Sequence, residues 1–207
     1  MTKSVVKIPG LPEFEFGAIH ADPAWPYITW SEKGQGRSPS QHYVTEEIKE
    51  IMAWPVAAHA AADSHLFLWC PCPWTPVVAE VAAAWGFNFS GLGFSWAKTT
   101  KRALVTARSV TAASDAMTPW HMGLGKMTRA NIELCWLGRR GNPQRLDKGV
   151  RELIVAPVRE HSRKPDEVYQ RIERYCAGPY LDPFARQRRP GWIVWGDEVD
   201  KFSGEAA

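Results

Sequence analysis

The 207-residue sequence lacks any long hydrophobic run. No apolar stretch approaches the roughly 20 residues that a helix needs to span a bilayer. The first six residues, Met1 to Val6, lack the apolar core of a secretory signal. These absences argue against a membrane or secreted protein, and we expect a cytoplasmic location.

Cysteine is scarce, and no paired metal-ligand spacing is present. The four cysteines are Cys70, Cys72, Cys135 and Cys176, and none of them form a CxxC pair. Cysteines in a cytosolic chain are reduced thiols by default, and structural zinc sites use paired spacings that are missing here. We therefore expect no metal site. A GxGxG loop is also missing, which taken alone argues against a dinucleotide-binding fold.

Basic residues gather in the central and C-terminal parts of the chain. The formal net charge of +3 is a weak pointer to an anionic partner. One charge run is usually a solvated face, but three clusters together favour a polyanion. The clusters are Lys98, Lys101, Arg102 and Arg108; Lys126, Arg129, Arg139, Arg140, Arg145, Lys148 and Arg151; and Arg186, Arg188 and Arg189. Some of the eleven tryptophans could stack on bases, although most are expected in the core or lining a cleft.

Strand-like and helix-like segments alternate along most of the chain. Apolar runs that end at turn residues predict strands, and Pro or acidic residues at the start of a segment predict helices. Such alternation predicts an α/β domain with a mostly parallel sheet flanked by helices. The expected strands are 16–21, 65–70, 89–98, 131–137, 153–156, 180–184 and 192–195, and the expected helices are 46–54, 75–85 and 164–176.

The chain is short enough for one domain, which we expect to cover residues 1–207. Residues 1–16 are expected to form an irregular lead-in. Residues 28–43 are rich in Gly and Ser. Residues 99–128 show no clear period, and a segment of that length without regular structure is usually a functional lid or disordered. We expect both to be mobile substrate loops. Thr45 is expected to cap the helix that follows it, and residues 138–143 are expected to form a turn.

A candidate site follows the first predicted strand. Asp22, Pro23, Ala24 and Trp25 come directly after the buried run 16–21. In open α/β sheets, ligands bind beyond the carboxyl ends of the strands. An acid, a rigid proline and an aromatic ring at that place are suited to a small-molecule site. An ordinary Asp-Pro turn beside a core tryptophan is the alternative.

Several segments together resemble one family of methyltransferases. The tetrad at 22–25 resembles the Asp-Pro-Pro-aromatic motif of enzymes that methylate the exocyclic amine of adenine. The resemblance extends over about residues 17–200 and is to the MT-A70 family, in particular its compact bacterial and phage members. It is carried, in order, by the segments 65–69, 94–98, 133–143, 160–169, 181–186 and 191–198. The resemblance implies a single Rossmann-like methyltransferase domain, permuted so that the catalytic motif precedes the cofactor-binding region.

The resemblance also implies roles for the tetrad. Asp22 and the carbonyl of Pro23 would accept hydrogen bonds from the amine of the target adenine. This would localise the nitrogen lone pair toward a methyl donor. Trp25 would stack on the target base and lie near the positive sulfonium. Ala24 stands where the family usually has Pro, so the loop is expected to be slightly less stiff.

The implied cofactor is S-adenosylmethionine. Lys164 would meet its methionine carboxylate, and Arg186 and Arg188 would lie near its ribose. Asp182 would accept hydrogen bonds from the ribose hydroxyls. In this family the Phe-Ala-Arg stretch, which here begins at Phe184, stands in place of the missing GxGxG loop. Each of these residues could instead have a purely structural role: Lys164 could be solvated, Arg186 could form a surface ion pair, and Asp182 could cap a loop. Asp197 and Glu198 would lie near the cofactor adenine, although Asp197 replaces a position that is often Asn and cannot donate as an amide does.

Further residues are candidates for holding a nucleic acid. Tyr43 would lie near the target adenine, with a packing role beside the following helix as its alternative. The expected phosphate contacts are Lys98, Lys101, Arg102, Lys126 and Arg129. His161 is expected to be structural. DNA is the favoured partner; RNA, and a non-catalytic nucleic-acid-binding subunit, are the alternatives. A homodimer is compatible with the sequence.

Overall fold

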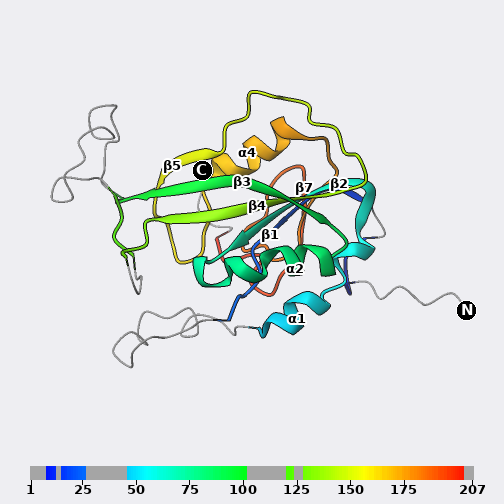
Figure 1. Ribbon diagram of the computed structural model, residues 1–207, viewed down its shortest axis with the longest axis horizontal. Helices are drawn as coiled ribbons and strands as arrows, with labels where there is room; N and C mark the ends of the chain where they lie inside the picture. Colours follow the sequence, from blue (N-terminus) through cyan, green and yellow to red (C-terminus); the bar gives the residue numbers. More distant parts are fainter. Residues whose placement is uncertain (1–7, 13–14, 27–45, 102–119, 124–127, 203–207) are drawn as a thin grey trace, which may run out of the picture.

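The computed structural model describes residues 8–12, 15–26, 46–101, 120–123 and 128–202 (Figure 1). Tyr43, Arg102 and Lys126 lie outside these residues, as do the predicted loop 28–43 and most of the loop 99–128. Within the described ranges, every helix is too short or too polar to span a lipid bilayer.

A seven-stranded sheet forms the centre of the fold. Its strands are β1 (Phe16–Ala21), β2 (Ala60–Cys70), β3 (Asn88–Thr99), β4 (Ile132–Arg140), β5 (Leu153–Pro157), β6 (Tyr180–Asp182) and β7 (Trp192–Val194), in the spatial order β5-β3-β4-β2-β1-β6-β7. Strand β4 runs antiparallel to its neighbours β2 and β3, and every other neighbouring pair is parallel. The predicted α/β fold with a mostly parallel sheet is confirmed.

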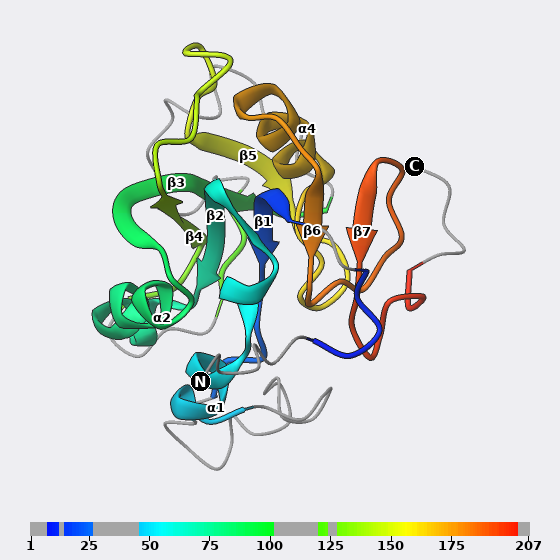
Figure 2. The same cartoon turned by 90° about the vertical axis from the view of Figure 1, so that its right-hand side faces the viewer.

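Helices cover both faces of this sheet. Helix α1 (Ile48–Ala53) and helix α2 (Val78–Ala84) lie on one side, and helix α4 (Asp166–Tyr175) lies on the other (Figure 2). Strand β2 explains the division, because successive side chains in a strand point to opposite faces. Leu66 and Leu68 pack in the cluster with α1 and α2, whereas Phe67 and Trp69 pack in the cluster with α4. A strand covered on both faces reads as a continuous apolar run, as 66–70 does.

Strand β4 is longer than predicted. The expected turn at 138–143 begins only after Arg140, and Gly138 and Arg139 still pair with β2. A Cβ atom on Gly138 would lie 3.1 Å from Cβ of Phe87 and 3.3 Å from Cβ of Leu66. Glycine at 138 therefore serves close packing inside the strand, and the turn falls at Gly141, where φ is +63°.

Two helix starts also differ from the prediction. The N-cap of α1 is Glu47, whose side chain forms a reciprocal capping box with Glu50, so Thr45 is not the capping residue. The segment Cys72–Val77 forms a 3₁₀ helix ahead of α2, where regular α-helix was expected from 75. Pro76 lies inside that segment and cannot donate a backbone hydrogen bond.

The described ends of two predicted irregular segments are tied to the sheet. Ile8 of the lead-in is buried and donates its backbone N–H to Nε2 of His59 at 2.9 Å. At the other segment, β3 continues to Thr99, and Trp120 forms an antiparallel bridge with Thr99. His121 donates to the carbonyl of Lys98 at 2.8 Å. Trp120 and His121, the first described residues after position 101, therefore lie beside the carboxyl end of β3.

Strands β1 and β6 lie side by side and run parallel, although they are far apart in the sequence. Ile19 pairs with Leu181, so the residues that follow each strand emerge at the same edge of the sheet. This edge brings the Asp22 motif next to Asp182 and the segment after it, in agreement with the predicted permuted arrangement.

Candidate active site

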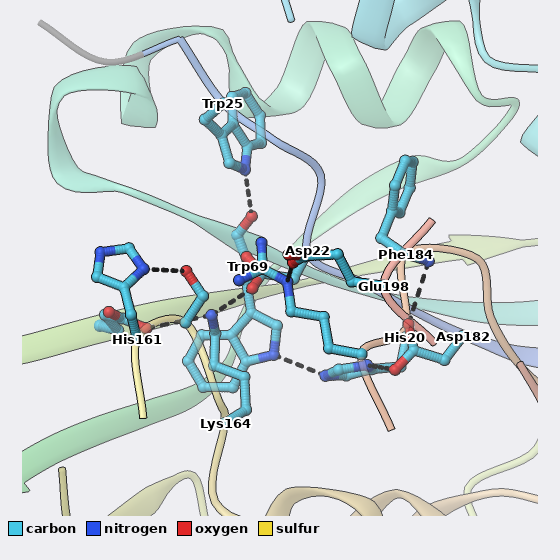
Figure 3. A network of polar contacts seen from close by, with 12 residues as sticks. His20, Asp22, Trp25, Trp69, His161, Lys164, Asp182, Phe184 and Glu198 are labelled. Carbon is cyan, nitrogen blue, oxygen red and sulfur yellow. Dashed lines mark hydrogen bonds and ion pairs between the residues drawn. The ribbon is translucent and has the colours of Figure 1, made fainter. Parts of the chain in front are cut away.

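Asp22 and Lys164 form an ion pair at the carboxyl edge of the sheet (Figure 3). Asp22 directly follows β1, and Lys164 precedes Pro165, the N-cap of α4. Nζ of Lys164 lies 2.5 Å from Oδ2 of Asp22 and 5.2 Å from the ring centroid of Trp69. The lysine side chain is 7% exposed and the aspartate side chain 21%. The two residues, 142 positions apart in the chain, share one partly buried site.

Two further charges extend this pair across the sheet. Oε2 of Glu133 on β4 lies 3.4 Å from Nζ of Lys164, and Oε1 of Glu133 pairs with Lys98 on β3. Burial alone would raise the pKa of Glu133, but the ammonium groups of Lys164 and Lys98 outweigh it and lower that pKa to about 2. The result is a line of alternating charge, Lys98–Glu133–Lys164–Asp22, that ends at the candidate catalytic acid.

The tetrad itself is held in a tight turn. The backbone N–H of Trp25 donates to the carbonyl of Pro23 at 2.8 Å, and the N–H of Glu46 donates to the carbonyl of Ala24 at 2.8 Å. The first bond uses one of the two acceptor positions on the Pro23 carbonyl. The second attaches the tetrad to the residues just before α1.

Trp25 lies in the hydrophobic core. Its side chain packs in the α1–α2 cluster at 4% exposure, and its indole N–H donates to the carbonyl of Trp69 at 2.8 Å. In Figure 3 the ring points away from Lys164 and Asp182. This differs from the prediction that Trp25 stacks on a target base. Burying a large ring that also satisfies its one donor stabilises the core more than exposing it would.

A pocket opens beside the ion pair, beyond the ends of β1 and β6. Among the predicted residues, Asp22, Lys164, Asp182, Phe184 and Arg186 line it. The other lining residues were not predicted as site residues; they are His20, Ser162, Arg163, Asp166, Tyr169, Ala185, Gln187, Arg189 and Phe202. Sequence spacing could have indicated some of them. His20 lies on β1 two residues before Asp22, and Asp166 and Tyr169 are three residues apart on one helix.

A buried polar network forms one wall of the pocket. Nδ1 of His20 lies 3.0 Å from Oδ2 of Asp182, and the hydroxyl of Tyr169 donates to the same oxygen at 2.9 Å. The indole N–H of Trp69 donates to Nε2 of His20 at 2.8 Å. The backbone N–H of Phe184 reaches Oδ1 of Asp182 at 3.3 Å. Burial, and then the Asp182 carboxylate, raise the pKa of Tyr169 well above its usual value.

The aromatic ring of Phe184 packs between two tryptophans. Its centroid lies 5.2 Å from Trp54 and 6.1 Å from Trp85. Arg186 approaches Glu198 at 3.4 Å, and Glu198 also pairs with Lys201 at 2.5 Å. Glu198 is not a lining residue, but it contacts Arg186, which is. Asp197 is exposed on the turn after β7 and does not line the pocket.

Arg189, and not Arg188, occupies the rim of the pocket. Arg188 is 66% exposed and pairs with Asp200 at 2.7 Å, away from the lining residues. The guanidinium of Arg189 lies 3.9 Å from the ring centroid of Tyr169 and pairs with Asp166. Arg188 thus does not line the pocket and its neighbour Arg189 does, because the side chains of adjacent residues in this segment point in different directions.

The predicted phosphate contacts are only partly described. Lys98 is engaged with Glu133, and its Nζ lies 4.9 Å from the ring centroid of Trp96. Lys101 and Arg129 are exposed near the carboxyl end of β3 and the start of β4. Arg102, Lys126 and Tyr43 fall outside the described residues.

Across the residues that the structure describes, no three His, Cys, Asp or Glu side chains gather as metal ligands would. The four cysteines, all of which are described, are free thiols, and three of them are buried. Burial raises the pKa of Cys70 and of Cys176 to about 12.

The chain is similar to known proteins over most of its length. The model of the MT-A70 family matches residues 16–198, from the first strand to the turn after the last. The chain belongs to the MT-A70 family. The match includes both halves of the site, the Asp22 tetrad and the segment from Lys164 to Glu198.

Individual relatives fall into two groups. The type II methyltransferase M.MunI from Mycoplasma sp is 25% identical over 209 residues, covering 92% of this chain and 81% of that protein. The human N(6)-adenosine-methyltransferase catalytic subunit METTL3 is 28% identical over 198 residues, as is the METTL3 subunit of Danio rerio. These matches cover 90% of this chain but only 28% of the METTL3 proteins.

Proposed function

We propose that this methyltransferase transfers a methyl group from S-adenosylmethionine to the exocyclic N6 amine of adenine in DNA. The observation that carries the proposal is the position of Asp22. It stands at the carboxyl end of β1, held by Lys164, on the wall of a pocket that the cofactor-side residues Asp182, Phe184 and Arg186 also line. In open α/β sheets, ligands bind beyond the carboxyl ends of the strands, so the acid and the pocket share the edge where we expect substrate and cofactor to meet.

The chemistry of the lining residues fits S-adenosylmethionine. That molecule carries a carboxylate, an ammonium group, a sulfonium, ribose hydroxyls and an aromatic base. The pocket offers cations at Lys164, Arg186 and Arg189, the carboxylate of Asp182, and the ring of Phe184. We assign the cofactor carboxylate to Lys164 and the ribose to the region of Asp182 and Arg186. When bound, the cofactor supplies an electrophilic methyl group.

The protein's own contribution is to position the amine. With Oδ2 of Asp22 on Lys164, Oδ1 is the oxygen that we assign to an N–H of the target amine. The second acceptor position of the Pro23 carbonyl is assigned to the other N–H. These bonds localise the nitrogen lone pair, which is otherwise delocalised into the ring. Fixed acceptors of this kind need no reorganisation during the reaction, so they stabilise the transition state effectively.

Because the Trp25 ring is buried in the core, we assign it a structural role in place of stacking on the target base. We propose that it supports the turn 22–25 from beneath and fixes the direction of the Pro23 carbonyl. Alanine at position 24 restricts the backbone less than proline would. Two backbone hydrogen bonds stiffen the turn instead, from the N–H of Trp25 to the carbonyl of Pro23 and from the N–H of Glu46 to the carbonyl of Ala24. The platform that stacks on the target base is assigned to residues outside the described ranges, with Tyr43 as the candidate.

The choice of DNA rests on the similarity to M.MunI. That similarity, to a type II methyltransferase, extends over 81% of M.MunI and 92% of this chain. The adenine amine as target is supported by the METTL3 proteins, whose names specify N(6)-adenosine methylation. A base inside a duplex is inaccessible, so we propose that the target adenine is flipped out of the stack before transfer.

The proposal is tested by incubating the protein with radiolabelled S-adenosylmethionine and, in parallel, unmethylated duplex DNA, single-stranded DNA and RNA of the same sequence. We expect label in DNA. Label in RNA alone would overturn the choice of polymer while keeping the chemistry. No label in any polymer, from protein that binds the cofactor, would favour a non-catalytic subunit.

A further inference from the structure

His20 has a defined protonation pattern in the wall of the pocket. The ring is 1% exposed and lies on β1, two residues before Asp22. The indole N–H of Trp69, which can only donate, points at Nε2 of His20 at 2.8 Å. Nε2 must therefore be an acceptor without a proton. The remaining ring proton is on Nδ1, 3.0 Å from Oδ2 of Asp182. His20 is thus a neutral ring that donates to Asp182.

Asp182 depends on such neutral donors. Its side chain is 4% exposed, and within the part of the chain that the structure describes no Lys or Arg nitrogen lies within 4.0 Å of its oxygens. His20, Tyr169 and the backbone N–H of Phe184 supply its hydrogen bonds. A buried carboxylate costs free energy unless it is well hydrogen-bonded. Loss of one donor would therefore let the carboxylate rotate or draw in a different partner.

The network joins four elements around the pocket. Trp69 is on β2, His20 on β1, Asp182 on β6 and Tyr169 on α4. The rings of His20 and Tyr169 are 4.7 Å apart, and Arg189 at the rim covers Tyr169 at 3.9 Å. The strand that carries Asp22 is thereby linked through His20 to the strand that carries the cofactor-side Asp182 (Figure 3).

We propose that His20, as the neutral Nδ1–H tautomer, is a positioning residue that orients the Asp182 carboxylate for the cofactor. It touches neither the methyl group nor the adenine. The inference rests on the proposed function, since it takes the pocket to be the S-adenosylmethionine site. The ring performs two separate tasks, one at each nitrogen: it accepts from Trp69 and it donates to Asp182.

Two substitutions separate these tasks. In His20→Asn, the amide nitrogen lies near the former Nδ1 and can still donate to Asp182, while Trp69 loses its acceptor. In His20→Gln, the amide oxygen can accept from Trp69, while Asp182 loses a donor. S-adenosylmethionine affinity is measured by calorimetry and thermal stability by circular dichroism. We expect His20→Asn to lower the Tm yet bind within about threefold of the wild type, and His20→Gln to bind about tenfold or more weakly.

Two further variants complete the design. Tyr169→Phe removes the other side-chain donor to Asp182 with little change in volume, and we expect about tenfold weaker binding from it as well. It serves in place of His20→Gln if that variant does not fold. The matched control is His65→Gln on β2, a histidine equally buried in the same sheet but with ring contacts to Phe67 and Tyr175 in place of the pocket. It should leave the affinity unchanged.

The outcomes are distinct. If affinity follows Tm in both His20 variants, or if His20→Gln and Tyr169→Phe both bind like the wild type, the positioning role is overturned while the proposed function stands. If the wild type does not bind S-adenosylmethionine, both proposals fall. Nitrogen NMR of the wild-type protein provides a reading without cofactor: a proton on Nδ1 of His20 is expected, and a proton on Nε2 would overturn the proposal.

Discussion

At the scale of single residues, the site is organised by charges that balance one another inside the protein. Lys164 forms ion pairs with two carboxylates, those of Asp22 and Glu133. Glu133 forms ion pairs with two ammonium groups, those of Lys164 and Lys98. Each of these side chains is less than one-third exposed. Removing Glu133 or Lys164 therefore leaves two partly buried charges of like sign near each other, which is more costly than losing a surface ion pair.

Glu133→Gln tests this charge balance. Because the pKa of Glu133 is lowered to about 2 in the folded protein, its charge stabilises the fold above the ordinary carboxylate pKa of 4.5. That contribution is lost as the pH falls from about 4.5 to about 2. We expect the variant to unfold about 1–3 kcal/mol more easily at pH 7 and to approach the wild type near pH 2. Urea unfolding at several pH values measures this, with the exposed Glu80→Gln as control; a difference that does not change with pH would contradict the account.

At the scale of elements, most of the secondary structure could be predicted from the sequence. Every predicted strand and helix is present, because apolar runs bounded by Pro, Gly and charged residues determine where these elements begin and end. The discrepancies occur where tertiary contacts override local signals. Gly138 indicated a turn but packs against Leu66 and Phe87 within β4. Lys164 was assigned from the resemblance alone, since no local pattern could reveal a contact with a residue 142 positions away.

Strand β2 contains a histidine that resists protonation. Burial, with the positive charge of Arg139 on β4 as a second cause, lowers the pKa of His65 to about 4. The unfolded chain takes up a proton near pH 6.5 that the folded chain excludes, so stability is lost as the pH falls from about 6.5 to about 4.

The contribution of His65 to this acid dependence is about 3 kcal/mol at most. We expect His65→Gln to be less stable than the wild type at pH 7.5 but to lose less stability between pH 7 and pH 4. Guanidinium unfolding across this range provides the measurement. Parallel pH dependences for variant and wild type would show that this histidine is not buried in its neutral form.

At the scale of the whole molecule, the carboxyl edge of the sheet collects both halves of the site and the described basic residues near it. Asp22, Asp182 and Lys164 come from distant parts of the sequence and meet because β1 and β6 are adjacent and parallel. The sequence predicted that edge through fold class and motif order. It could not predict the His20 network or the choice between Arg188 and Arg189, since these depend on side-chain directions in the assembled fold.

Nucleic-acid binding should depend steeply on salt if basic residues at this edge contact phosphates. We expect affinity for DNA to fall strongly between about 50 and 300 mM salt. Lys101→Ala and Arg129→Ala should each weaken binding for all sequences and reduce the salt slope by about one. Fluorescence anisotropy at several salt concentrations measures both effects, with Lys49→Ala, which is exposed on α1 and outside the basic clusters, as control. Binding that is insensitive to salt would contradict the assignment of these residues.

The most direct test of the central claim compares wild type and Asp22→Asn in single-turnover methylation of adenine-containing DNA, with the product nucleoside identified by mass spectrometry. The amide retains the size of Asp22 but loses the charge that pairs with Lys164. We predict N6-methyladenine from the wild type, a loss of at least about a hundredfold in rate from the variant, and S-adenosylmethionine binding by both. Near-wild-type transfer by Asp22→Asn, or methylation at another atom, would contradict the assignment of Asp22 as the acceptor of the adenine amine.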